Sequence, residues 1–295
     1  MRRRTVAFIG LAVLALALAM VYAAGGVLSS PALREVGLPP VSLRAQALLL
    51  KTDTGDQVSG WFSPGQTGKG AVLLLHGVRG DRREMVGRAQ WLHGLGFAVM
   101  LIDLPAHGES SGEHITFGVR ESAGVRAALA DLRERLPRER VGVIGVSLGA
   151  ASLVLAQPQP AVDAVVLESM YPAITEAVAD RLGLHLGNWS RPFASALLLQ
   201  LPLRLGISAD DLRPIDHIAS LNAPLLLIAG DQDQHTQLDE SERLFAAASE
   251  PKTLWIVKGA AHVNLHDFEP ASYEARVGGF LRKHLAGVTS ELPSR

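Results

Sequence analysis

A five-residue motif, Gly145 to Gly149, has the form Gly-x-Ser-x-Gly with Ser147 at its centre. The apolar run Val141 to Val146 precedes it, and a helix-compatible run, Ala150 to Ala156, follows. A strand entering such a pentapeptide and a helix leaving it form a nucleophile elbow. The turn is so tight that a Cβ at either glycine would collide with a neighbouring strand or helix. The motif therefore predicts a strained serine whose hydroxyl stands clear of the sheet, placed to attack a carbonyl carbon.

A serine hydroxyl is a weak nucleophile until a base takes its proton and a third group orients that base. In elbow proteins the chain order is Ser, then an acid, then His. The loop Gly259 to His262 follows the last predicted strand, and an acidic loop, Gly230 to Asp233, follows the strand before it. Both loops are expected at the same sheet edge as Ser147. We predict Ser147, Asp233 and His262 as the catalytic residues.

The acid has two further candidates. Asp231 and Asp233 are two residues apart, so in an extended loop they point opposite ways and only one can face His262. We predict Asp233 for this role, and Asp231 as an acceptor for loop amides. Glu168, at the end of the predicted strand 164–167, is a third carboxylate that could reach the histidine.

Two other histidines lie near these loops. His235 is too close to Asp233 along the chain to be oriented across the sheet by it, so we predict that it supports the site or lies at the surface. His76 ends a buried strand before a loop, and we predict that it holds that loop in place.

Acyl transfer also needs donors for the oxyanion that forms on the carbonyl oxygen. One is predicted to be the backbone N–H of Leu148, at the start of the helix after the nucleophile. The loop after the strand 71–76 supplies the second candidate, the N–H of Val78, because Gly77 lets the backbone come close there.

Composition excludes several other classes of protein. The chain of 295 residues carries 28 basic and 29 acidic side chains, so a nearly balanced charge gives no reason to expect nucleic acid as a partner. Cysteine is absent, which excludes disulfides, thiolate catalysis and Cys-based zinc sites. The predicted chemistry requires no cofactor and no metal. The sequence leaves the oligomeric state open.

Residues 1–30 are predicted to be a membrane anchor or a signal peptide. Arg2, Arg3 and Arg4 precede an uncharged, mostly apolar stretch, which directs the amino terminus to the cytoplasmic side. A signal peptide would be cut after Ala23, leaving a secreted or periplasmic enzyme. The apolar run is long for a signal peptide and long enough, at about 20 residues, to span a bilayer, so we favour the anchor. Either alternative places the domain outside the cytoplasm.

Residues 31–46 contain Pro31, Pro39 and Pro40 and no helical period, and are predicted to form a tether. From 47 to 286 the pattern is that of a mostly parallel sheet covered by helices on both faces, with 287–295 left as a tail. The predicted strands are 47–52, 58–64, 71–76, 97–102, 141–146, 164–167, 225–229 and 253–257, and the predicted helices are 82–95, 117–136, 148–156, 238–248 and 269–285.

Residues 171–223 interrupt this alternation. They contain no strand-like run and carry the apolar series 196–201, which is too long for a plain connection. We predict a short helical lid over the carboxyl edge of the sheet; an extra helix pair packed on the flank is the alternative.

Taken together, these motifs resemble the α/β-hydrolase superfamily over roughly residues 45–285. The resemblance rests on His76-Gly77, the segment from Asp103 to Ser110, the elbow, and the loops that end at Asp233 and His262. It implies that the last aspartate of the acidic loop belongs to the triad, and that Asp103 and His107 are structural. The anchored, short-lidded layout is further similar to the serine aminopeptidase and lysophospholipase-like branch, including membrane-anchored proteins of the BEM46 type.

The loop after Gly77 departs from the superfamily pattern, because it reads Val-Arg-Gly-Asp where small residues are usual. Arg79 either reaches the mouth of the pocket and binds an anionic group, or is solvated or paired with Asp81 or Glu84. The expected function is hydrolysis of a carboxylic ester with a small-molecule or lipid-like acyl group. The alternatives are a peptidase or an acyltransferase of the same fold, and a non-catalytic binding protein.

Overall fold

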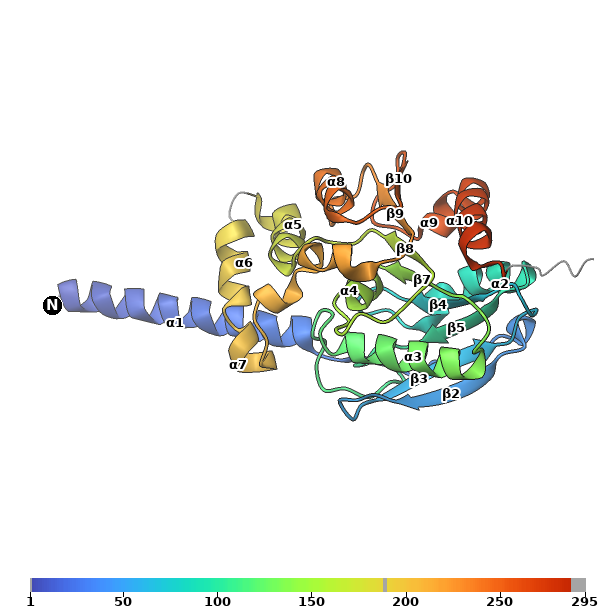
Figure 1. The fold of residues 1–295 in the computed structure, drawn as a ribbon. Helices are drawn as coiled ribbons and strands as arrows, with labels where there is room; N and C mark the ends of the chain where they lie inside the picture. The colour runs from blue at the N-terminus through green and yellow to red at the C-terminus, as the bar shows by residue number, and fades with distance from the viewer. Residues whose placement is uncertain (1, 188–189, 288–295) are drawn as a thin grey trace, which may run out of the picture.

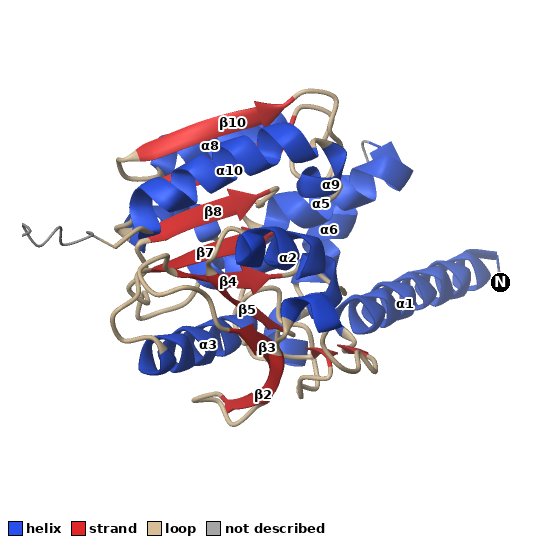
Figure 2. Ribbon diagram, turned by 90° about the vertical axis from the view of Figure 1, so that its right-hand side faces the viewer, coloured by secondary structure: helices blue, strands red, loops and turns tan. Residues whose placement is uncertain are grey.

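A computed structural model describes residues 2–187 and 190–287. Its centre is an eight-stranded sheet with the order β10-β9-β8-β7-β4-β5-β3-β2 (Figures 1 and 2). Neighbouring strands are parallel from β10 to β5, whereas β3 pairs antiparallel with both β5 and β2. The strands are β2 (Gln46–Lys51), β3 (Gln57–Ser63), β4 (Ala71–Leu75), β5 (Ala98–Ile102), β7 (Val141–Val146), β8 (Ala164–Glu168), β9 (Leu225–Gly230) and β10 (Lys252–Val257).

The central strands β4, β5, β7, β8 and β9 are buried on both faces of the sheet, which explains their continuous apolar runs. Along β4, Leu73 and Leu75 enter one core, while Val72 and Leu74 enter the other. The first core is closed by α3 (Glu121–Arg135), α4 (Leu148–Val154) and α8 (Leu238–Ala247). The second is closed by α2 (Val86–Gly94), α9 (Leu265–Phe268) and α10 (Pro270–Leu285). The predicted fold class is confirmed.

Helix α3 begins later than the predicted residue 117. Phe117 has a φ of 55°, outside the helical region, and the Glu121 carboxylate accepts hydrogen bonds from the amides of Thr116 and Gly118. The carboxylate of Glu121, the first residue of α3, thus fixes the preceding segment in a turn, and residues 117–120 lie outside the helix.

Residues 31–46, predicted as a tether, instead pack on the domain. Strand β1 (Ala32–Leu33) pairs with β6 (His107–Gly108), and Leu43 in a short 3₁₀ helix (Val41–Leu43) is fully buried. Glu109 accepts hydrogen bonds from the amides of Val36 and Gly37. The tether prediction is wrong because prolines without a helical period describe an extended chain equally well whether it is free or bound. The predicted tail, 287–295, lies outside the described residues except for Gly287.

Two further parts stand outside the sheet and its covering helices (Figure 1). Residues 171–223 contain α5 (Ile174–Leu186), α6 (Ser190–Leu198) and α7 (Leu201–Leu205), followed by short 3₁₀ turns; we call α5–α7 the helical insertion. Helix α1 (Arg2–Ser29) projects from the domain and packs against α6. Its stretch Thr5–Ser29 is long and apolar enough to cross a membrane.

Candidate active site

Ser147 occupies the turn between β7 and α4. Its backbone has φ 49° and ψ −107°, a conformation that a residue with a side chain rarely adopts. A Cβ on Gly145 would lie 2.7 Å from the Ala150 backbone, and one on Gly149 would lie 2.6 Å from the Leu75 carbonyl oxygen. The backbone of neighbouring segments comes so close to both positions that only glycine fits, as the motif predicts for a nucleophile elbow.

His262 and Asp233 meet beside this elbow. The His262 Nδ1 lies 2.7 Å from the Asp233 Oδ2. A carboxylate can only accept, so Nδ1 carries the hydrogen and Nε2 has a free lone pair. Asp233 also accepts hydrogen bonds from the Thr236 hydroxyl and from the amides of His235 and Thr236. Burial opposes ionisation of Asp233, but the hydrogen bond and charge of His262, with these amides, hold its pKa below the usual value.

The two alternative acids are engaged elsewhere. Asp231 accepts a hydrogen bond of 2.7 Å from the Gly259 amide, so it joins the two loops rather than facing the histidine ring. Glu168 is buried and forms an ion pair of 2.6 Å with Arg88, and it also accepts a hydrogen bond from the Tyr273 hydroxyl. The carboxylate that faces His262 is Asp233.

The predicted oxyanion donors belong to two segments that both lie beside Ser147. Leu148 is the first residue of α4, where backbone N–H groups lack partners within the helix. A Cβ built on Gly77 would lie 3.9 Å from the Ser147 Cβ, so the loop before Val78 runs directly beside the nucleophile. Val78 and Leu148 both line the cavity that contains Ser147.

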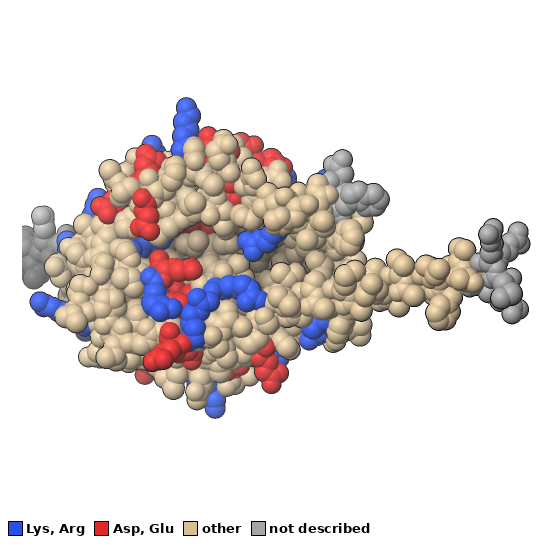
Figure 3. Space-filling view, turned by 180° about the vertical axis from the view of Figure 1, so that it is seen from behind, with Lys and Arg blue, Asp and Glu red and all other residues tan. Residues whose placement is uncertain are grey.

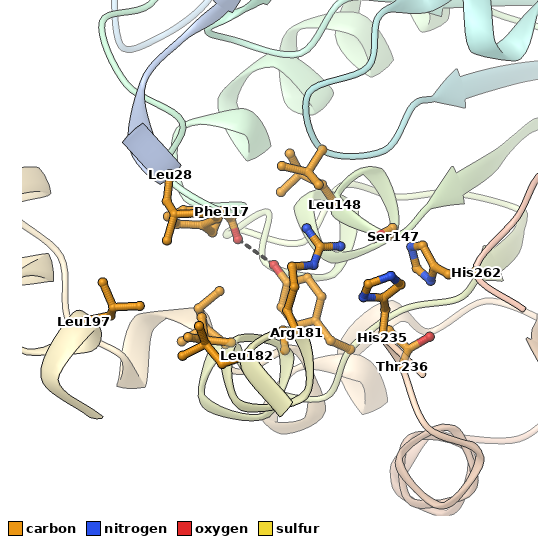
Figure 4. Close-up of a pocket in the computed structure, with 15 residues that line it drawn as sticks. Leu28, Phe117, Ser147, Leu148, Arg181, Leu182, Leu197, His235, Thr236 and His262 are labelled. Carbon is orange, nitrogen blue, oxygen red and sulfur yellow. Dashed lines mark hydrogen bonds between the residues drawn. The ribbon is translucent and has the colours of Figure 1, made fainter. Parts of the chain in front are cut away.

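An apolar cavity of about 130 Å³ opens at Ser147 (Figure 4). We call it the apolar cavity. His262 and His235 stand at the serine end, and Leu28, Phe117 and Leu197 lie toward the other end. Its remaining walls are Val78, Leu148, Tyr171, Ile174, Ala177, Val178, Arg181, Leu182 and Thr236. The lining suits a hydrocarbon chain.

A second cavity, of about 480 Å³, is also lined by Ser147 and His262. We call it the polar cavity, because Arg79, Arg88, Arg181 and Glu84 line it together with Asn264. Burial raises the pKa of the Glu84 carboxyl. Among these charged groups, Arg88 is paired with Glu168 and Arg79 is bound to the end of α1, which leaves Arg181 and Glu84 to face a ligand. The described lining therefore has no excess of acidic side chains to hold an ammonium group.

Several lining residues were not predicted from sequence. Arg181 on α5 borders both cavities, and Figure 4 shows it reaching over the pocket beside Ser147. His235, predicted as supporting or superficial, lines the apolar cavity with its ring edge-on to His262 at 5.2 Å. Burial, and then the charge of Arg181, lower the pKa of His235. A helical residue placed over the site by packing leaves no local sequence signal.

Arg79 does not extend freely into the polar cavity. Its guanidinium donates to the Val27 carbonyl at the end of α1 and, over 2.9 Å, to the Ser30 hydroxyl. The residue thus caps α1, a role that neither alternative for Arg79 included.

His76 is fully buried and fixes the loop that leads to Val78. Its Nδ1 lies 2.7 Å from the Gly77 carbonyl oxygen, and its Nε2 accepts a hydrogen bond from the Leu104 amide. Burial, reinforced by the nearby His107, lowers the pKa of His76 from 6.5 to about 3. Asp103 is likewise structural, since it pairs with Arg82 and accepts from the Glu109 amide.

The depressed pKa of His76 predicts a loss of stability in mild acid. The unfolded chain binds a proton at this residue below pH 6.5, whereas the folded chain stays neutral until about pH 3. The stability that neutral His76 gives the folded chain is therefore fully present above pH 6.5. Below that value, the free energy of unfolding falls by about 1.4 kcal/mol for each pH unit. When the pH falls from 7.5 to 5.0, we expect the unfolding free energy of His76→Gln to decrease by roughly 2 kcal/mol less than that of the parent protein. Urea denaturation of both proteins in detergent measures this difference. Equal losses would contradict this account.

Within residues 2–187 and 190–287, no group of three His, Asp or Glu side chains lies close enough to hold a metal ion.

A mostly parallel sheet with a serine elbow at its carboxyl edge is the arrangement of the α/β-hydrolases. The chain belongs to the alpha/beta hydrolase family, whose model matches residues 72–275. It is 33% identical over 217 residues to the uncharacterized protein Rv2307c of Mycobacterium tuberculosis, covering 73% of this chain and 71% of the relative. The uncharacterized protein YqkD of Bacillus subtilis is 23% identical over 242 residues, 80% of this chain and 78% of that protein.

Solved structures confirm the fold. The Pyrococcus furiosus esterase Pf2001 superposes with a TM-score of 0.72 at 23% identity, covering 88% of this chain and 99% of the esterase. The hypothetical protein PA2218 of Pseudomonas aeruginosa gives a TM-score of 0.64 at 20% identity, over 85% and 97% of the two chains. The superfamily predicted from the motifs is confirmed. The finer resemblance, to the aminopeptidase and lysophospholipase-like branch with its BEM46-type members, stays a prediction.

Proposed function

We propose that this protein is a serine hydrolase that cleaves carboxylic esters with an apolar acyl group. The observation that carries the proposal is the meeting of three features at one point. Ser147 stands on a strained elbow, His262 and Asp233 are hydrogen-bonded beside it, and an apolar cavity begins at the same serine. The fold of the esterase Pf2001 agrees with this class of reaction.

In the proposed mechanism, His262 Nε2 takes the proton of Ser147 as its oxygen attacks the ester carbonyl carbon. The Asp233 carboxylate holds the tautomer and stabilises the imidazolium that forms. The amides of Val78 and Leu148 donate to the oxyanion of the tetrahedral intermediate. His262 then gives its proton to the leaving alcohol, and a water molecule resolves the acyl-enzyme by the same steps, which restores Ser147.

The cavities favour an ester over a peptide with a free amino terminus. An aminopeptidase must hold an ammonium group, commonly with acidic side chains. Of the described residues that line either cavity, Glu84 is the acidic one, and Arg181 lines both cavities. Transfer of the acyl group to an acceptor other than water would use the same residues, and product analysis with added alcohols would reveal it.

We also propose that the catalytic domain lies outside the cytoplasm. Arg2, Arg3 and Arg4 precede the apolar helix, and basic residues are retained on the cytoplasmic side. The oligomeric state stays open, and the proposed partners are the acyl substrate and the membrane.

The test is turnover of p-nitrophenyl esters from acetate to palmitate by the full chain in detergent, with labelling by an alkylphosphonate. A cavity near 150 Å³ holds about six carbon atoms, and the apolar cavity measures about 130 Å³. Burial of one methylene group contributes about 0.8 kcal/mol, so we expect kcat/KM to rise by up to about fourfold for each methylene added to the acyl chain. The rise should level off near hexanoate. Phosphonate adducts on a serine other than Ser147 would contradict the proposal. So would the absence of ester turnover in untreated protein from a preparation whose Ser147 the phosphonate labels.

A further inference from the structure

The last turns of α1 form part of the wall of the apolar cavity. Leu28 lines this cavity together with Ser147 (Figure 4). A smaller cavity of about 40 Å³, which we call the seam cavity, lies beside it between α1 and the helical insertion. The two cavities have five lining residues in common, which are Leu28, Phe117, Ile174, Val178 and Leu197. Gly25 and Ser29 of α1 face Leu198 and Leu201 of the insertion across this smaller cavity. We call this boundary the α1 seam.

Polar side chains of the domain hold α1 at the seam. Gln200 donates to the Val21 carbonyl over 2.9 Å, and Arg204 donates to the Tyr22 carbonyl over 2.7 Å. The Arg204 guanidinium also lies 4.2 Å from the centre of the Tyr22 ring, a cation–π distance. Arg79 caps the other end of this segment at Val27. These contacts fix the helix over two turns, not at one point.

The same contacts distinguish an anchor from a cleaved signal peptide. Cleavage after Ala23 would remove Val21 and Tyr22, the residues that Gln200 and Arg204 bind. It would also leave the segment from Ala24 to Ser29 as a free end beside the pocket. A signal peptide needs no fitted contacts to the mature domain, so the geometry indicates that α1 is retained.

The length of α1 places the seam at the membrane surface. The apolar stretch Thr5–Ser29 has 25 residues and spans about 37 Å, against about 30 Å of hydrocarbon. Its last turn and a half therefore reaches the headgroup zone, with Tyr22 and Arg204 near the boundary, where such side chains are favoured. The projecting shaft of α1 carries no charged side chain between the domain and its grey tip (Figure 3).

The helical insertion presents apolar side chains beside this part of α1. Leu199 is 77% exposed and Leu203 is 92% exposed, next to Gln200 and Arg204, which bind the helix. Figure 1 shows α6 crossing α1 near the point where α1 leaves the domain, with α7 beside the same part of α1. Exposed leucines at this level suit contact with acyl chains at the bilayer surface.

The enclosed volume also points to the bilayer. A cavity near 150 Å³ holds about six carbon atoms. The apolar cavity offers about 130 Å³ and the seam cavity about 40 Å³, so a long acyl chain extends beyond both. A chain that continues from the apolar cavity into the seam cavity passes between α1 and the helical insertion, which directs it toward the membrane rather than toward the polar cavity.

From these observations we infer that α1 is a retained anchor that forms one wall of the acyl site, and that long acyl chains of bilayer esters enter through the α1 seam. The substrate class is then a membrane-resident ester whose tail stays in the bilayer while its carbonyl reaches Ser147. The chemistry in this inference rests on the proposed function, whereas the position of the α1 seam does not.

Turnover by the full chain in phosphatidylcholine nanodiscs tests the entry route. Leu198→Trp fills the seam at a residue that lines the seam cavity but not the apolar cavity. The matched control is Leu18→Trp, on a lipid-facing part of α1 that is 60% exposed. We expect Leu198→Trp to lower the ratio of palmitate-ester to butyrate-ester kcat/KM at least tenfold and the control to leave it within twofold. An unchanged ratio in Leu198→Trp, with phosphonate labelling intact, would overturn the route.

A second readout does not depend on hydrolysis. The chain has no cysteine, so one introduced cysteine is labelled specifically. In a Ser147→Ala background, we expect nitroxides on lipid acyl chains to quench the fluorescence of a bimane attached at Leu197→Cys. A bimane attached at Glu134→Cys, which is exposed near the end of α3, should not be quenched. Intact mass of the membrane-extracted protein should include residues 1–23. Absence of quenching at 197, or a chain that begins at Ala24, refutes the inference, whereas failure of ester turnover alone refutes the proposed function.

Discussion

Replacement of Ser147 by alanine is expected to lower kcat/KM for the best p-nitrophenyl ester by roughly 10⁵-fold or more. The oxygen that forms the acyl-enzyme is then missing, and only positioning and the oxyanion donors remain. The backbone at this position is already strained, with φ 49°, and alanine adopts it at no greater cost than serine. The fold should therefore survive, and the loss should be in kcat. Steady-state turnover of the full chain in detergent measures it.

A second serine provides the control. Ser169 is also buried, also has a positive φ, of 48°, and lines the polar cavity beside Ser147. Ser169→Ala should keep activity within about tenfold, because no step is assigned to its hydroxyl. Comparable losses in the two variants would mean that a damaged turn, and not a missing nucleophile, explains the effect of Ser147→Ala.

Parts of this site could be predicted because their residues have local physical requirements. Gly145 and Gly149 are needed wherever a strand turns into a helix within van der Waals contact of its neighbours. The loops of Asp233 and His262 could be placed because carboxyl ends of parallel strands meet at one edge. The sheet itself was predictable since strands buried on both faces read as continuous apolar runs.

Other features depend on distant parts of the chain. Leu28 and Arg181 reach the pocket only through the packing of α1 and α5, and neither has a neighbour in sequence that marks it. The segment 31–46 binds the domain through backbone amides to Glu109, a pairing that side-chain patterns do not reveal. The length and hydropathy of α1 predicted a membrane segment, but its fit to Gln200 and Arg204 required the folded insertion.

Substitution of Asp233 by asparagine is expected to lower kcat by about 10⁴-fold. In the structure, Oδ1 of Asp233 accepts from two backbone amides, and Oδ2 accepts from His262 Nδ1. An asparagine satisfies those amides with its oxygen and must turn its NH₂ group toward His262. Nδ1 then becomes the acceptor and Nε2 carries the hydrogen, so the ring cannot take the proton of Ser147.

Matched amide variants at the two other carboxylates decide whether this account is correct. Asp231→Asn should stay within about tenfold of the parent in kcat, because Asp231 holds the Gly259 amide and not the histidine ring. Glu168→Gln should act on stability, costing about 3 to 5 kcal/mol of unfolding free energy, because it leaves Arg88 buried without its ion pair. Urea denaturation and kcat, measured on all three variants, separate the two effects. Replacing the carboxylate that orients His262 by its amide changes the tautomer of His262 but leaves the shape of the site almost unchanged. If Asp231→Asn or Glu168→Gln lowered kcat as much as Asp233→Asn in folded protein, the role of orienting His262 could not be assigned to Asp233.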